Sequence, residues 1–176
     1  MKILIVITTI LGLAPALDGQ ASDAGAHGVW REYAYPVDNF AITLPSEPTP
    51  HKDVQLPDLP ITVYTSGGVT LRVESTSGGC DFAITDQLKM IEEVKTGQRK
   101  PDPAFRLDSA SVRHGDLEGY PFLEFEQTVG NTNHYYERWY CAVRRLYMFS
   151  AAWPIGQPKP RNVGRIVRSF RFLKKQ

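Results

Sequence analysis

The apolar residues of this chain change their period twice, and that change limits the folds the chain can adopt. Residues 69–74 alternate apolar and polar side chains, the two-residue period of a strand with one buried face. Between residues 84 and 94 the spacing becomes three or four residues, the period of an amphipathic helix. Alternation returns over residues 120–153, and a second helical stripe follows over residues 163–170. This order predicts an α+β fold, an antiparallel sheet with helices packed on its faces.

Proline, glycine and asparagine residues set the bounds of these elements. Helices are expected over residues 81–97, with Asp81 as the N-cap, and over residues 160–170, followed by a short strand at 170–173. The run 146–153 is apolar on both faces, which predicts a central strand covered on two sides. The other strands are expected at residues 30–35, 40–44, 61–65, 69–74, 109–114, 120–128 and 133–143.

The first sixteen residues have the composition of a secretory signal peptide. Lys2 gives a positively charged start, and residues 3–13 form an apolar run too short to span a bilayer comfortably. Residues 14–16, Ala-Pro-Ala, form a small-x-small cleavage site, and a cut after Ala21 is the alternative. The chain is therefore expected to be exported, to the periplasm or out of the cell.

Removal of residues 1–16 leaves a flexible lead-in at residues 17–29 and one domain at residues 30–176. Roughly 155 residues are enough for a single domain with its own core. No second apolar run approaches eighteen residues, so no transmembrane segment is expected in the mature chain. The formal net charge of +1 gives no reason to expect nucleic acid as a partner.

The two cysteines, Cys80 and Cys141, suggest a disulfide because an even number of cysteines in an exported protein usually pairs. The alternative is two buried free thiols. A bond between them would tie the start of the first helix to a strand of the sheet. Their spacing excludes a C-x-x-C redox motif.

No pattern in the chain frames a catalytic, cofactor or metal site. Ser150, His134 and Asp116 supply the residue types of a hydrolytic triad, but no G-x-S-x-G sequence surrounds any serine. No histidine has another His, Cys or carboxylate two or four residues away within one expected helix or strand, so a metal site would require distant residues to converge. The four histidines are scattered, at His27, His51, His114 and His134. We therefore predict no enzyme activity, no cofactor and no metal.

Two sets of residues are candidates for contact with a partner. Arg161, Arg165 and Arg168 recur at i, i+4 and i+7 opposite the apolar stripe of the last helix, and no acidic residue occurs after position 158. They form either a basic docking face or an ordinary solvated one. The second set is aromatic, and it either lines a groove or fills the core beneath the helices. Its members are Tyr136, Trp139 and Tyr140.

Three short stretches resemble the PsbP-like superfamily. Residues 39–45, Asn-Phe-Ala-Ile-Thr-Leu-Pro, resemble its F-x-I-x-L-P opening. Residues 151–154, Ala-Ala-Trp-Pro, followed by a helix and by Ser-Phe-Arg-Phe at residues 169–172, resemble its end. The resemblance implies an α/β/α sandwich around an antiparallel sheet. Members of that superfamily include photosystem subunits, a nuclear-transport regulator and exported bacterial proteins of unknown role, and they act mostly by binding proteins.

The sequence therefore predicts an exported, non-enzymatic protein-interaction domain. Its partner would be another envelope or extracellular protein, and an anionic membrane surface is the alternative partner for the basic C-terminal helix. The alternative function is a carrier with an apolar pocket between helix and sheet for a small ligand. A hydrolase with an unrecognised site is the third hypothesis.

Overall fold

The computed structural model describes residues 29–48, 50–52, 61–75, 80–100, 104–130, 132–142 and 144–173. The predicted signal peptide, with its cut after Ala16 or Ala21, and nearly all of the predicted lead-in lie outside the described residues.

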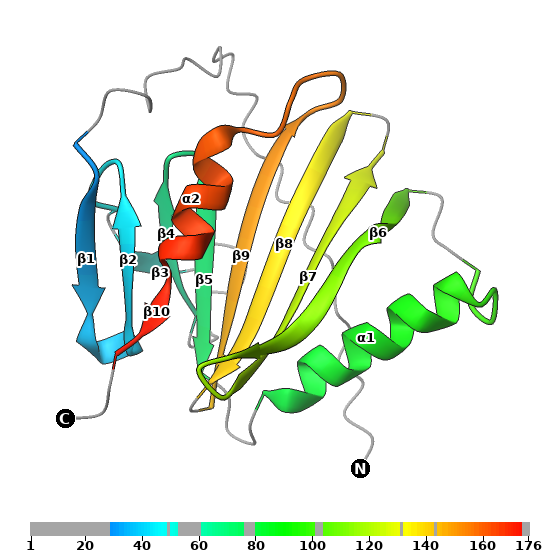
Figure 1. The fold of residues 1–176 in the computed structure, drawn as a ribbon, viewed down its shortest axis with the longest axis horizontal. Helices are drawn as coiled ribbons and strands as arrows, with labels where there is room; N and C mark the ends of the chain where they lie inside the picture. Colours follow the sequence, from blue (N-terminus) through cyan, green and yellow to red (C-terminus); the bar gives the residue numbers. More distant parts are fainter. Residues whose placement is uncertain are drawn as a thin grey trace.

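Two antiparallel sheets and two α-helices make up the described part of the chain (Figure 1). The small sheet has the order β1-β2-β10. The large sheet has seven strands in the order β3-β4-β5-β9-β8-β7-β6. The bounds of the helices are α1 (Asp81–Lys95) and α2 (Arg161–Ser169). Those of the strands are β1 (Arg31–Tyr35), β2 (Phe40–Leu44), β3 (His51–Lys52), β4 (Ile61–Ser66), β5 (Val69–Ser75), β6 (Phe105–Leu117), β7 (Tyr120–Val129), β8 (Asn133–Ala142), β9 (Arg145–Pro154) and β10 (Arg171–Phe172).

The mixture of antiparallel strands and helices confirms the predicted α+β class, but the strands divide between two sheets where the sequence pattern suggested one. The N-terminal strands β1 and β2 pair with each other and with β10 from the C-terminus. A 3-10 turn at Pro36–Asp38 and the left-handed Asn39, with φ of 60°, connect β1 to β2. The small sheet thus joins the first and last strands of the described chain, which lie on either side of β2 (Figure 1).

Strand β9 is the middle strand of the large sheet, as its apolar character on both faces predicted. Its successive residues Leu146 and Tyr147 belong to two different hydrophobic clusters. Because alternate side chains of a strand point to opposite faces, the two clusters lie on opposite faces of the large sheet. One cluster includes Ile166 and Phe170 from α2 and its end, and the other includes Ile84 and Ile91 from α1.

The start of α1 differs in detail from the prediction. Asp81 is the first residue of the helix, and Cys80 occupies the N-cap position without a side-chain hydrogen bond that caps the helix. The disulfide between Cys80 and Cys141 holds this end of the helix against β8, as the sequence predicted. Covalent attachment to the sheet therefore fixes the helix start where a capping side chain was expected.

Strand β6 is longer than the predicted strand at residues 109–114. It runs from Phe105 to Leu117, and its register with β7 shifts between Asp108 and Arg113. The extra residues form a bulge, which interrupts the alternation that marks a strand in a sequence. The predicted range, residues 109–114, covers the bulge itself, and the regularly paired residues 105–108 and 115–117 on either side of it were missed.

Candidate functional site: the arginine face of α2 and the charged strip beside it

Helix α2 is attached to the sheets at both of its ends. Near its start, the side-chain amide of Asn162 donates a hydrogen bond to the carbonyl of Gly67 in the turn between β4 and β5. At its end, the Ser169 hydroxyl accepts a hydrogen bond from the backbone N–H of Thr43 at 2.9 Å and donates one to the carbonyl of Ile166 at 2.7 Å. These bonds, with the burial of the apolar stripe, fix the rotation of α2 about its axis.

Gly67 is required at the turn where α2 approaches. Its φ of +57° is a conformation that residues with a side chain rarely adopt. A Cβ there would also come within 3.0 Å of Pro45 and 3.2 Å of Ile166. The absence of a side chain in this turn therefore lets the helix lie close to the large sheet.

The outward side of α2 carries an exposed row of three arginines, which we call the arginine face: Arg161, Arg165 and Arg168. The guanidinium of Arg165 lies 3.9 Å from the centre of the Trp30 ring. The Arg168 guanidinium lies against Gly164, where an added Cβ would be 3.0 Å from it. Lys159 and Arg171, on either side of the helix, are ion-paired with Glu126 and Glu32. Within the part of the chain that is described, none of the three arginines has a carboxylate partner.

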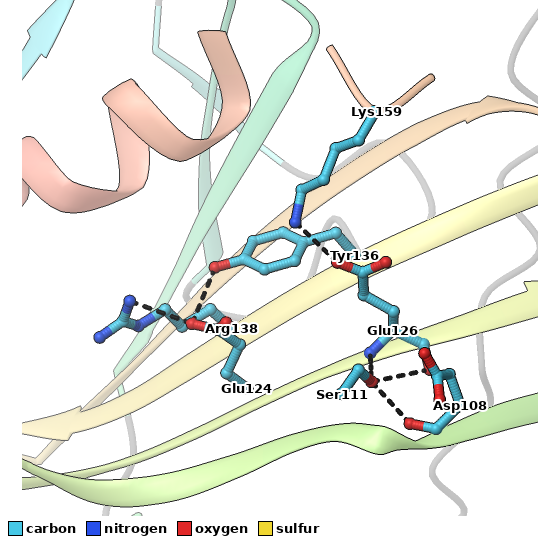
Figure 2. Close-up of polar contacts among 7 residues, drawn as sticks. All are labelled: Asp108, Ser111, Glu124, Glu126, Tyr136, Arg138 and Lys159. Atoms are coloured by element: carbon cyan, nitrogen blue, oxygen red, sulfur yellow. Dashed lines mark hydrogen bonds and ion pairs between the residues drawn. The ribbon is translucent and has the colours of Figure 1, made fainter. Parts of the chain in front are cut away.

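Beside α2, the large sheet carries an alternation of charges around a buried tyrosine (Figure 2). We call this group the charged strip: Glu124, Glu126, Tyr136, Arg138 and Lys159. Glu124 and Arg138 are directly opposite each other on β7 and β8, and their side chains form an ion pair at 3.0 Å. Oppositely charged residues at directly opposite positions of neighbouring strands stabilise the sheet.

Tyr136 lies between the two ion pairs of the charged strip. Its hydroxyl donates a hydrogen bond to Oε2 of Glu124 at 3.2 Å. Burial, followed by the neighbouring Glu124 charge, raises the pKa of Tyr136 well above its ordinary range, so the hydroxyl remains a donor at neutral pH. Arg138 also stacks on aromatic rings, 4.6 Å from the centre of Phe122 and 5.0 Å from that of Tyr140.

Lys159 reaches the charged strip from the segment between β9 and α2. Its Nζ lies 2.7 Å from Oε1 of Glu126 and 3.9 Å from the centre of the Tyr136 ring. The backbone of Glu126 is fixed in turn, because its N–H donates to the Ser111 hydroxyl at 2.7 Å (Figure 2). The strip thus presents fixed charges and hydrogen-bonding groups on a rigid sheet.

The aromatic residues predicted to line a partner surface lie in the protein interior. Tyr136, Trp139 and Tyr140 are 4%, 8% and 1% exposed. The Tyr140 ring stacks on Phe170 with a centroid separation of 5.1 Å. These positions agree with the alternative that the aromatic residues fill the core, and in this structure the three side chains offer little surface to a partner.

A half-buried carboxylate, that of Glu137, lies on the other face of β8. Both carboxylate oxygens of Glu137 accept hydrogen bonds at 2.9 Å, from the Gln127 amide and from the Trp139 indole. Burial raises the pKa of the Glu137 carboxyl above its ordinary value, and these hydrogen bonds oppose the rise. In the sequence Glu137 lies between Tyr136 and Arg138, and no local pattern indicated that two side chains would hold its carboxylate.

The residues of the hypothetical triad are not brought together. His134 stacks on Trp153 with a centroid separation of 5.6 Å, whereas Ser150 lies on the opposite face of the sheet by the alternation of β8 and β9. The carboxylate of Asp116 accepts a hydrogen bond from the backbone N–H of Gly119 at 2.6 Å in the turn after β6. Each residue has a separate local role.

One group of side chains within the described ranges is close enough to share a metal ion: Cys80, Asp81 and Cys141, whose ligand atoms lie within 4.8 Å of one another. The two sulfurs are bonded to each other, which accounts for the proximity. His51, His114 and His134 are not part of this group, and His27 lies outside the described residues.

A small cavity lies between the two sheets, and one residue of α2 contributes to its lining. Its lining includes Phe40, Leu71, Phe149 and Ile166, and its volume is about 10 Å³. This volume admits about one water molecule. A small organic ligand would therefore have to displace core side chains to enter there. As for membranes, neither helix of the described chain has the length and apolarity that a bilayer span requires.

No protein-family model matches the chain, and no curated protein matches it. Among solved structures, the chain is similar to the solution structure of cyanobacterial PsbP (CyanoP) from Synechocystis sp. PCC 6803, with 13% identity, a TM-score of 0.46, and coverage of 83% of this chain and 95% of that one. It is also similar to a crystal structure of a protein from Bacteroides thetaiotaomicron VPI-5482, with 12% identity and a TM-score of 0.47, covering 82% of this chain and 49% of that one. These likenesses concern the fold alone.

Proposed function

We propose that this chain is an exported, non-enzymatic interaction domain whose arginine face binds an acidic surface of another envelope or extracellular protein. The observation that carries the proposal is the exposed row of Arg161, Arg165 and Arg168, none of them ion-paired with a carboxylate of the described chain.

The arginine face is held in one orientation before any partner arrives. Val163, Ile166 and Val167 bury the inner side of α2, and the bonds of Asn162 and Ser169 attach both ends. A fixed row of charges loses less conformational entropy on binding than charges on a mobile segment. Acidic side chains of a partner would complement these cations and speed the encounter.

The stack of Arg165 on Trp30 adds an aromatic contact to the arginine face. Arginine and tryptophan are over-represented among the residues that contribute most to protein interfaces. Trp30 is only partly buried, so its edge remains available to a partner. This combination favours a protein surface, with apolar and acidic groups together, over a purely ionic ligand.

The proposed export rests on two further features. A disulfide between Cys80 and Cys141 persists in an oxidising compartment such as the periplasm or the extracellular space. Residues 1–16 have the composition of a signal peptide. The proposal also includes the sandwich arrangement, in which α1 and α2 cover opposite faces of the large sheet, and the separate clusters that contain their side chains support it.

The test is capture of partners from envelope extract by the mature protein and by a triple variant, Arg161→Glu, Arg165→Glu and Arg168→Glu. The matched control reverses three exposed lysines on and after α1, Lys89→Glu, Lys95→Glu and Lys100→Glu, and so has the same net charge. We expect the arginine variant to lose at least about tenfold in captured partner and the lysine variant to bind like wild type. Capture by wild type should weaken as salt is raised.

If the arginine variant and the lysine variant capture equal amounts of partner, the arginine face does not take part in binding. A flotation assay with vesicles containing anionic lipid distinguishes the membrane alternative. If the arginine face binds such vesicles and captures no protein, the partner assignment is wrong.

A further inference from the structure

Lys159 occupies a site with three walls. Its Nζ lies 2.7 Å from the Glu126 carboxylate, 3.9 Å from the centre of the Tyr136 ring and 5.8 Å from that of Trp153. A carboxylate with two aromatic rings is the arrangement by which proteins recognise ammonium groups, since the ring faces and the carboxylate are both negative.

The walls are part of the rigid sheet and do not depend on Lys159. Tyr136 and Trp153 are buried residues of β8 and β9, and the Tyr136 hydroxyl is held by Glu124. The backbone of Glu126 is held by Ser111 at 2.7 Å. Figure 2 shows Lys159 reaching down onto the Tyr136 ring from outside the sheet, with Glu126 beside it.

The segment that carries Lys159 is held by other bonds. The backbone N–H of Ile155 donates to Thr132 at 2.9 Å, and that of Gln157 donates to Pro154 at 3.1 Å. At the start of α2 the N–H of Val163 donates to Pro160 at 3.2 Å. The Lys159 side chain is 34% exposed, so water already reaches it. Its ammonium group can therefore leave the site while the segment keeps its path.

We propose that Glu126, Tyr136 and Trp153 form a recognition site for a primary alkylammonium group, the side chain of a lysine from a partner protein. In the unbound chain Lys159 fills this site, and the partner lysine replaces it. This inference does not depend on the arginine face. The site is made by other residues, and it binds a positively charged group, whereas the arginine face binds acidic groups.

Lys159 competes with any free amine because it is attached to the same chain. A tethered group acts at a high effective concentration, on the order of millimolar or above. A partner lysine must therefore be delivered by other contacts of its interface. Removal of the Lys159 side chain should make the empty site measurable with a simple amine.

The probe is n-butylammonium, which matches a lysine side chain, with n-butanol as its neutral counterpart. The proteins are wild type, Lys159→Ala, the double variant Lys159→Ala with Glu126→Gln, and Lys95→Ala as a control on a distant exposed lysine. Binding is followed by the NMR signals of the Trp153 indole and the Tyr136 ring. Circular dichroism and the midpoint of thermal unfolding show that each variant is folded.

For Lys159→Ala we expect saturable shifts at both rings with a dissociation constant on the order of 1–10 mM. Wild type and Lys95→Ala should bind at least about tenfold more weakly, and so should the double variant. Butanol should cause no saturable shift. Absence of ammonium binding by folded Lys159→Ala would overturn the proposal, and so would equal binding of butanol. If Lys159→Ala does not fold, the same titration is made with Lys159→Ser. Saturable binding of n-butylammonium would support the proposal, and its absence would overturn it.

Discussion

The hydroxyl of Ser111 takes the place of a backbone acceptor between β6 and β7. Its Oγ accepts a hydrogen bond from the backbone N–H of Glu126 at 2.7 Å and donates one to the carbonyl of Asp108 at 2.6 Å. In the bulge of β6 the direct backbone pairing stops at Asp108 and resumes at Arg113. One side chain thus satisfies a strand amide that the bulge would otherwise leave without a partner.

Ser111→Ala should therefore destabilise the protein by about 1–2 kcal/mol, because the Glu126 N–H loses its acceptor. Hydrogen exchange at the Glu126 amide should become faster, since the lost bond is local. Ser109→Ala, in the exposed part of the same bulge, is the control and should stay within about 0.5 kcal/mol of wild type. Unchanged exchange at Glu126 in Ser111→Ala would show that the hydroxyl does not perform this role.

The bulge also shows where prediction from sequence stops. Strands β4 and β5 and both helices were predicted because each buries one face and repeats a local period. The range expected for β6 covers the bulge, whose residues form no regular pair, and it omits the regularly paired residues 105–108 and 115–117. The pairing of β2 with β10 joins residues 40–41 to 171–172, and no local period reports such a distant partner.

The candidate site was also predicted only in part, because a local sequence pattern does not report contacts between distant residues. The arginines of α2 were located because the apolar stripe of the helix fixes which side faces out. By contrast, Glu126 and Lys159 are 33 residues apart, and their ion pair depends on the tertiary structure. The density of aromatic residues in β8 could not show which of them are buried. Tyr140 and Trp139 are successive residues of β8 that belong to two different hydrophobic clusters, and both side chains are buried.

Phe170 joins α2 and the two sheets, and its truncation should be among the most damaging core changes. Its ring stacks on Tyr140 at 5.1 Å and on Phe40 at 5.7 Å, and it meets Phe149 edge to face at 5.1 Å. Phe170→Ala should lower the free energy of unfolding by about 3–5 kcal/mol, measured by urea denaturation. Val37→Ala, at an apolar side chain that is 83% exposed, should change it by less than about 0.5 kcal/mol. Similar losses in the two variants would contradict the placement of Phe170 in the core.

Glu137 should make the stability of the protein depend on pH. Burial raises the pKa of its carboxyl above the ordinary value of 4.5, so the folded state keeps this proton to a higher pH than the unfolded state does. Between the two pKa values the folded state binds more protons, and this carboxyl therefore makes stability fall as the pH rises.

Glu137→Gln removes that titration, so the variant should gain stability relative to wild type as the pH rises from 4.5 through the folded-state pKa. The variant also loses one of the two hydrogen bonds that Gln127 and Trp139 donate to this side chain. That loss lowers stability by the same amount at every pH, so it does not change how stability depends on pH. Unfolding midpoints in urea at successive pH values measure the difference. Glu92→Gln, at an exposed position of α1, controls for the change in net charge. Parallel curves for Glu137→Gln and wild type would refute the effect.

The disulfide between Cys80 and Cys141 should contribute to stability mainly through the unfolded chain. The two cysteines are 61 positions apart, and closing a loop of that size removes about 4 kcal/mol of unfolded-state entropy in the chain-entropy model. Reductant should therefore lower the urea midpoint of the purified mature protein and add the mass of two hydrogen atoms. The double variant Cys80→Ala and Cys141→Ala should have a low midpoint that reductant does not change. If both thiols of the wild type react with an alkylating reagent before reduction, the bond is absent and α1 must be held to the large sheet by the packing of its apolar side chains, such as Ile84.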